Sequence, residues 1–144
     1  MELRVFYKDG VRFVAEARGH QLTVDQPIGA GGQDLGMTPP ELLLASLGSC
    51  AAYYAVEYLK ARGLATTGVE VKVSGEKAAG PARIGSFLIE VIVPSLGNEK
   101  QLEGVRAAVN KCLIHNTLLH APSIEIAISE RGQTAVSPPS PQMR

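Results

Sequence analysis

The sequence predicts an α+β domain with the element order βββ-α-ββ-α-β. Three observations support this order: short alternating segments at the N-terminus, one long uncharged segment near the middle, and alternating segments around a helical pattern in the second half. Strands and helices fall in separate runs, which is typical of α+β domains. With 144 residues and 45% hydrophobic content, the chain can form one core. We expect a single domain over residues 1–132 and a disordered tail over 133–144.

The N-terminal strands form a meander. Residues 3–7 and 11–15 alternate between apolar and polar side chains, and Asp9-Gly10 between them favours a two-residue hairpin turn. Gly19-His20 marks a second turn, and residues 22–25 follow as a third strand. The glycine-rich segment after it has neither GxGxxG nor a Walker lysine, so it predicts a loop and not a phosphate site.

A long central helix follows this loop. Thr38-Pro39-Pro40-Glu41 is typical of a helix start, because threonine can cap, proline is tolerated in the first turn and Glu41 can bond back to the cap. Arg62-Gly63 is typical of a helix end. A helix of about 24 residues would be about 36 Å long, so we expect it to run through the middle of the molecule.

The central helix also predicts a homodimer. It carries no charge over residues 42–56, so a sheet on one side would leave apolar surface exposed on the other. Gly48 indicates a close approach by another backbone, which we expect a partner subunit to supply. The segment is shorter than the roughly 20 residues of a membrane-spanning helix. Because the N-terminus also lacks the pattern of a signal peptide, we expect a cytoplasmic protein that is not bound to membranes.

The second half of the chain predicts the remaining elements. Residues 69–76 and 84–94 have the pattern of two strands. Asn98 can cap a second helix, whose apolar stripe extends to Cys112. The last strand is predicted at residues 124–130.

Composition excludes several classes of protein. The 14 basic residues balance the 14 acidic ones and tryptophan is absent, so we expect no nucleic-acid partner. The two cysteines lie outside any CxxC motif and are too few for a secreted disulfide framework. Cys112 and His115 would give only half of a tetrahedral zinc site, and no second ligand pair follows. We expect no metal and no cofactor.

Cys50 lies inside the apolar run, where it is either a small core residue or a nucleophile. A nucleophile must be a thiolate, and Cys50 lies too far along the helix to gain from the helix dipole. A cation must come from elsewhere, and Arg18 or His20 at the end of the meander could supply it. Glu41 could be the capping acid or the carboxylate that orients the arginine. His115 could reach the sulfur of Cys112 from one helical face.

Residues 19–50 and 111–118, GHQLTVDQPIGAGGQDLGMTPPELLLASLGSC and KCLIHNTL, resemble the OsmC/Ohr family of osmotically inducible and organic-hydroperoxide-resistance proteins. The pattern GH-x-x-x-x-D is similar to an OsmC-like branch. This resemblance implies an OsmC-like fold in an intertwined homodimer with active sites at the interface. It implies a peroxidatic Cys50 and a resolving Cys112, with Glu41 and Arg18 as further site residues. Two positions depart from the family pattern, because Leu113 stands where proline is common and His115 where small polar residues are common.

The resemblance implies a thiol peroxidase that reduces alkyl or fatty-acid hydroperoxides in oxidative-stress defence. Cys50 would form a sulfenic acid and then a disulfide with Cys112. A dithiol, lipoyl-type in some family members, would regenerate both thiols. We expect Leu47, Tyr53 or Tyr54 to line an apolar substrate pocket. The alternative is a non-catalytic dimer that binds an apolar small molecule in the same pocket, with both cysteines as packing residues.

Overall fold

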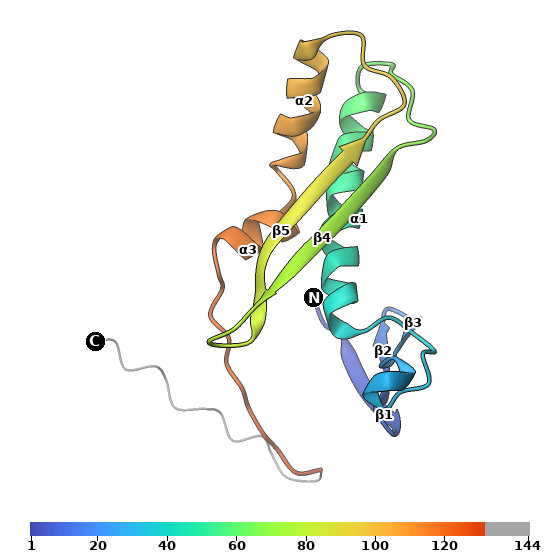
Figure 1. Ribbon diagram of the computed structural model, residues 1–144, viewed down its shortest axis with the longest axis vertical. Helices are drawn as coiled ribbons and strands as arrows, with labels where there is room; N and C mark the ends of the chain where they lie inside the picture. The colour runs from blue at the N-terminus through green and yellow to red at the C-terminus, as the bar shows by residue number, and fades with distance from the viewer. Residues whose placement is uncertain (132–144) are drawn as a thin grey trace, which may run out of the picture.

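The structure is a computed structural model that describes residues 1–131; the expected disordered tail at 133–144 lies outside the described residues. The elements occur in an α+β order with one long central helix (Figure 1). They are β1 (Arg4–Asp9), β2 (Arg12–Ala17), β3 (His20–Val24), the 3-10 helix η1 (Ile28–Ala30), α1 (Pro39–Lys60), β4 (Glu70–Ala78), β5 (Arg83–Ile92), α2 (Glu99–Val109) and α3 (Leu113–Leu119).

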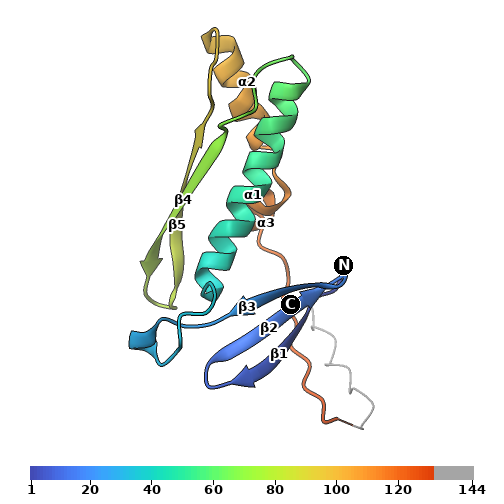
Figure 2. The ribbon, with the colours of Figure 1, turned by 90° about the vertical axis from the view of Figure 1, so that its right-hand side faces the viewer.

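The strands form two separate antiparallel sheets. β1, β2 and β3 form the expected meander, in which Phe6 pairs with Val14 and Ala15 with Leu22. β4 and β5 form a hairpin in which Val73 pairs with Ile89. The hairpin lies along α1, whereas the N-terminal sheet lies beyond one end of that helix (Figure 2).

The start and end of α1 confirm the sequence signals. Thr38 adopts an extended conformation, its side chain accepts a hydrogen bond from the backbone N–H of Glu41, and Glu41 bonds back in a complete capping box. The helix ends at Lys60, and Gly63 takes a positive φ of 65°, which glycine adopts at little cost. The 22 residues of α1 are close to the expected length.

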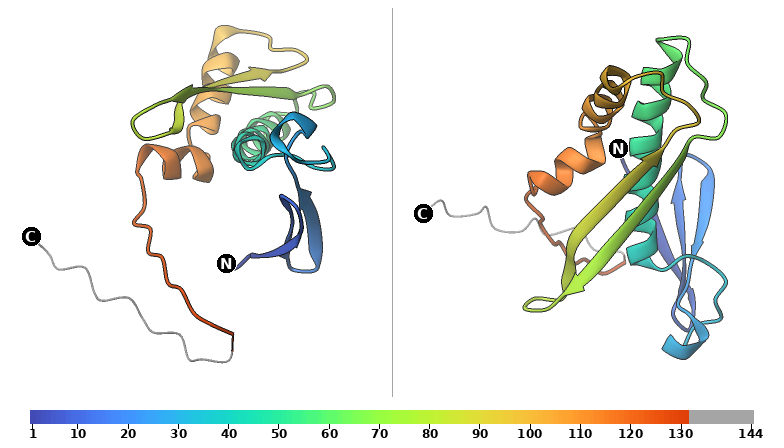
Figure 3. Two further views of the ribbon diagram at one scale, coloured as in Figure 1. Left: turned by 60° about the horizontal axis from the view of Figure 1, so that its bottom comes forward. Right: turned by 45° about the horizontal axis from the view of Figure 1, so that its top comes forward.

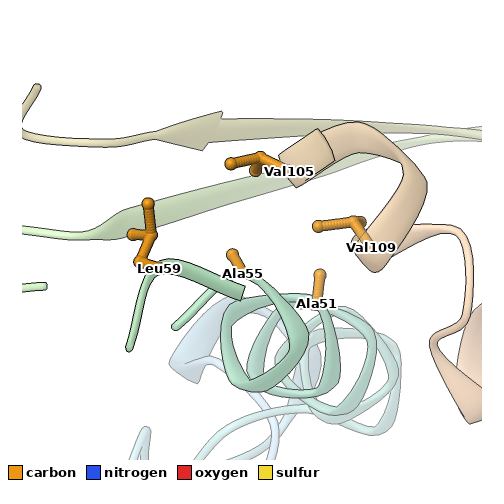
Figure 4. Packing of buried hydrophobic residues seen from close by; sticks show 5 residues of the cluster. All are labelled: Ala51, Ala55, Leu59, Val105 and Val109. Carbon is orange, nitrogen blue, oxygen red and sulfur yellow. The ribbon is translucent and has the colours of Figure 1, made fainter. Parts of the chain in front are cut away.

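The hydrophobic core lies between α1, α2 and the inner face of the β4–β5 hairpin. Ala51, Ala55 and Leu59 of α1 face Val105 and Val109 of α2 (Figure 4). All five are less than a tenth exposed. The two alanines are small enough to let the α2 valines pack close to α1, so this contact fixes α2 and the segment after it against the central helix.

The second helix is shorter than expected. Asn98 caps α2 by accepting a hydrogen bond from the backbone N–H of Gln101 at 3.0 Å, as the sequence predicts. The helix ends at Val109, and a separate helix, α3, begins at Leu113. Cys112 is therefore the N-cap of α3 and not part of the apolar stripe of α2. The helical spacing of apolar residues continues from Val109 to Cys112, although the chain bends between the two helices. Apolar spacing alone does not reveal this bend.

The expected last strand at 124–130 is wrong for this structure. The segment runs extended away from the helices and forms no strand (Figures 1 and 3). Its alternating side chains, Ile124, Ile126 and Ile128, are 84%, 79% and 88% exposed. A strand needs a neighbour to satisfy its backbone groups, and no strand within residues 1–131 pairs with this segment.

As the sequence predicts, a single chain leaves part of the apolar surface of α1 exposed. Leu47 and Leu59 are buried, but Tyr53 is 61% exposed. Gly48 is buried and close to Val73 of β4, where an added Cβ would lie 3.0 Å from a Val73 methyl carbon. The close neighbour of Gly48 is thus a strand of the same chain.

By length and composition alone, α1 could cross a membrane, since its mean hydropathy over 18 residues is 1.3. Central helices of globular domains satisfy the same criterion, and part of this helix is buried inside the fold.

Candidate functional site

The fold brings the two cysteines together, although they lie 62 positions apart in the sequence. Cys50 lies on the middle of α1 and is half-buried, whereas Cys112 has no exposed surface. α3 packs against α1, and Cys50 lies close enough to Cys112 to raise the pKa of its thiol. Both are free thiols in this structure. The pair combines one thiol near the surface with one inside the protein.

The surroundings of Cys112 hold it in the protonated form. Burial raises the pKa of the Cys112 thiol, and the hydrogen bond with Cys50 and the charge of a Cys50 thiolate raise it further. Backbone N–H groups of His115 and Ile114 act in the opposite direction but do not outweigh burial. The N–H of His115 donates to the Cys112 sulfur at 3.4 Å, as expected where a side chain caps a helix.

His115 reaches this sulfur through its backbone and not through the imidazole ring that the sequence suggested. The ring nitrogen Nδ1 is buried and has no hydrogen-bond partner within residues 1–131. The imidazole instead lines a cavity between β5 and α2. The sequence correctly placed His115 near Cys112 but gave no indication of the direction of its ring.

Glu41 takes the capping role. Its Oε2 accepts hydrogen bonds from the backbone N–H of Thr38 at 2.7 Å and from the Thr38 hydroxyl at 2.8 Å. These two bonds, the backbone bond foremost, hold the pKa of Glu41 below its usual value. Glu41 precedes Cys50 by nine residues, or about 13 to 14 Å along the helix axis, so it does not lie beside the sulfur of its own chain.

The structure does not bring Arg18 and His20 to Cys50 within one chain. Both are exposed at the turn between β2 and β3, where Arg18 has a positive φ of 54°. This turn lies at the start of β3. The chain continues toward α1 from the other end of β3, which is about 16 Å from the turn. Arg18 instead lines a hollow with Arg4 and Glu16 at the far end of the sheet.

Asp25 is a buried residue whose structural role sequence analysis missed. Its side chain is 1% exposed and accepts backbone N–H groups from Gln26 at 2.8 Å, Gln33 at 3.1 Å and Leu35 at 3.2 Å. Burial alone would raise the pKa of Asp25, but the three hydrogen bonds together lower it below the usual value. Asp25 thereby shapes the loop that leads into α1. An aspartate between a strand and a glycine-rich loop is the signal that could have identified it.

No metal site is formed by the part of the chain that the structure describes, because no three His, Cys, Asp or Glu side chains converge there. The chemistry that the arrangement offers is that of two adjacent thiols. Thiols in contact can alternate between a dithiol and a disulfide after modest movement.

Comparison with known proteins identifies related sequences and folds. The family model described as OsmC-like protein matches residues 31–127. This range includes both cysteines, the capping box and the whole of the core described above. No curated protein matches the chain significantly in sequence.

Solved structures share the fold at low sequence identity. A protein from Psychrobacter arcticus has a TM-score of 0.73 at 20% identity, over 80% of this chain and 85% of that one. An OsmC-like protein from Mycoplasma pneumoniae has a TM-score of 0.69 at 20% identity, over 83% and 87%. An organic hydroperoxide resistance protein from Legionella pneumophila has a TM-score of 0.57 at 18% identity, over 81% and 87%.

Proposed function

The chain belongs to the OsmC-like protein family, and we propose that it is a cysteine-based thiol peroxidase that reduces organic hydroperoxides. The observation that carries this proposal is that the packing of α3 on α1 brings Cys112 near Cys50, close enough for Cys50 to raise the pKa of the Cys112 thiol. Two packing cysteines have no need to meet, whereas a peroxidatic and a resolving cysteine must. The likeness in fold to a hydroperoxide resistance protein is consistent with this chemistry.

In the first step, the Cys50 thiolate attacks the terminal oxygen of the hydroperoxide. A sulfur–oxygen bond forms, the O–O bond breaks, and the alkoxide leaves with one proton as an alcohol. Cys50 is thereby oxidised to a sulfenic acid. Cys50 suits this role because it is the more accessible of the two thiols.

In the second step, Cys112 attacks the Cys50 sulfenic acid. A sulfur–sulfur bond forms, and the hydroxyl leaves with the Cys112 proton as water. The raised pKa of Cys112 keeps it a thiol until the sulfenic acid forms beside it. An external dithiol then reduces the disulfide by thiol–disulfide exchange and leaves as a disulfide itself. A lipoyl-type dithiol is our candidate reductant.

Activation of Cys50 requires a cation, and Arg18 and His20 of the same chain do not lie beside it. We propose a cytoplasmic homodimer in which Arg18 of one subunit, oriented by Glu41, faces Cys50 of the other. The exposed side of α1 and the exposed isoleucines at 124–130 support this arrangement, since a second copy could cover both. His20, next to the same turn, is the alternative cation.

The proposed substrates are alkyl or fatty-acid hydroperoxides. The uncharged face of α1 around Cys50 carries Tyr53 and Tyr54, whose rings meet edge to face with centroids 5.4 Å apart. These rings would favour an apolar substrate over hydrogen peroxide once a second subunit closes the site. Leu47, expected beside them, is instead 1% exposed and packed in the core.

A thiol titration tests the proposal. One equivalent of cumene hydroperoxide should rapidly consume both free thiols of the wild-type protein. Cys50→Ser should lose the reaction, because the attacking sulfur is gone. Cys112→Ser should react once and retain a sulfenic acid that dimedone traps. Unreacted thiols in the wild type would instead favour the non-catalytic binding protein.

A further inference from the structure

A separate cavity of about 360 Å³ lies between β5, α2 and the start of α3. Ile89 and Val91 line it from the strand, and Leu102, Val105 and Val109 line it from the helix. Neither cysteine belongs to its lining. The cavity is therefore distinct from the thiol pair, and an occupant would not need to take part in peroxide chemistry.

The apolar part of this cavity fits a flexible aliphatic chain. All its hydrophobic lining residues are valine, leucine or isoleucine, and the lining includes no phenylalanine, tyrosine or tryptophan. At roughly 30 Å³ for each water-sized unit, the cavity holds about ten to twelve such units. This is the size of a medium-chain fatty acid such as octanoate.

Polar groups gather at one end of the cavity. Arg106 and Asn110 follow Leu102 at four-residue intervals, so all three share one face of α2 and the face becomes polar toward the helix C-terminus. His115 from α3 also lines the cavity.

The charge at this end favours an anion. Arg106 supplies a guanidinium, and its ion pair with Glu103 at 3.5 Å is weak because both side chains are more than half exposed. Arg106 can therefore exchange Glu103 for a ligand carboxylate at little cost. Asn110 and His115 can donate further hydrogen bonds to the same group.

We propose that this cavity binds a medium-chain aliphatic carboxylate, with its chain between β5 and α2 and its carboxylate at Arg106 and His115. The proposal goes beyond the peroxidase function, because it involves no redox step and neither cysteine. The ligand would pack against both β5 and α2 and would stabilise the contact between them.

Calorimetric titration of the full-length protein with sodium octanoate tests the head group. Arg106→Gln should weaken binding about three- to tenfold, as expected for one partly exposed charged hydrogen bond. Glu103→Gln should strengthen binding, because it removes a like charge and frees Arg106. Lys100→Gln is the matched control: it removes one positive charge from α2 outside the cavity lining and should change affinity little. Equal loss in Lys100→Gln and Arg106→Gln would overturn the assigned head-group site.

Two further measurements test the chain and the location. Leu102→Trp should abolish binding by filling the cavity, and it should fold because Leu102 is 44% exposed. His115→Phe should weaken binding while keeping the ring volume. Cys50→Ser should bind octanoate as the wild type does, which separates this site from the peroxidase site. Absence of octanoate binding by the wild type at millimolar concentration, or unchanged binding by Leu102→Trp, would overturn the proposal.

Discussion

At the scale of single residues, the two cysteines differ in burial, and this difference suits them to different roles. Cys50 meets the surface, and Cys112 is enclosed and held as a thiol by its surroundings. The sequence placed both residues on neighbouring helices but could not show the contact, because it depends on the bend between α2 and α3. Cys112 caps α3 and is not part of the α2 stripe.

Removing Cys50 should change the acidity of Cys112. In Cys50→Ala, the hydrogen bond and the thiolate charge that raise the Cys112 pKa are both lost, so this pKa should fall while remaining above the usual value because of burial. Cys50→Ser is the matched control, since its hydroxyl retains a hydrogen bond. Titration of the thiolate ultraviolet absorbance measures the Cys112 pKa in both variants. The same Cys112 pKa in the two variants would contradict the assigned contact.

Asp25 should make stability depend on acid. Its folded pKa is lowered, so its contribution is fully present above the unfolded pKa of about 4 and is lost as the pH falls through the folded value. Asp25→Asn should lower the melting temperature at neutral pH and flatten the decline in acid, because an amide cannot accept all three backbone N–H groups.

Asp34→Asn is the control for Asp25, since it makes the same change in charge on the same loop. Asp34 is exposed and has a positive φ of 59°, which asparagine tolerates well. The melting temperature of Asp34→Asn should match that of the wild type. Similar losses in both variants would show that loop charge, and not the buried hydrogen bonds, governs stability.

At the scale of elements, local signals predicted more than distant contacts did. The capping box, the Asn98 cap and the turn at Gly63 each involve a few neighbouring residues, and all three are confirmed. The positions of Arg18 and Glu41 relative to Cys50 depend on how sheets and helices meet, which local patterns do not encode. Residues 124–130 alternate between apolar and polar side chains as a strand does, but no neighbouring strand pairs with them within residues 1–131.

Leu59 should be the strongest single anchor of α1 against α2. It is fully buried in the cluster with Ala55 and Val105, so Leu59→Ala should lower the free energy of unfolding by about 2–5 kcal/mol. Leu119→Ala removes the same atoms from a side chain that is 66% exposed and should cost far less. Urea unfolding measures both variants, and equal losses would contradict the assigned core.

At the scale of the whole molecule, one chain leaves unusually much apolar surface uncovered. The outer side of α1 and the isoleucines at 124–130 are both exposed, and the N-terminal sheet lies beyond the end of α1 (Figure 2). A single chain also leaves Arg18 far from Cys50. A homodimer would cover the apolar surface and bring Arg18 of one subunit to Cys50 of the other. Assembly and activity should therefore depend on each other.

Disrupting the isoleucine segment should therefore dissociate the dimer and reduce peroxidase activity together. Ile126→Asp places a charge where a strand of a second copy would pair, whereas Ile126→Val preserves an apolar β-branched side chain. Sedimentation velocity should find a dimer for the wild type and Ile126→Val, and mainly monomer for Ile126→Asp. A monomeric wild type with full peroxidase activity would contradict the proposed shared site.

Peptide mapping by mass spectrometry after one equivalent of cumene hydroperoxide tests the central claim most directly. The account predicts a peptide pair joined by a Cys50–Cys112 disulfide within one chain, which a dithiol such as dihydrolipoamide returns to free thiols. In Cys112→Ser, it predicts a dimedone adduct on Cys50 alone. Oxidation that leaves Cys50 and Cys112 unlinked, or first modifies Cys112, would contradict the assigned peroxidatic and resolving roles.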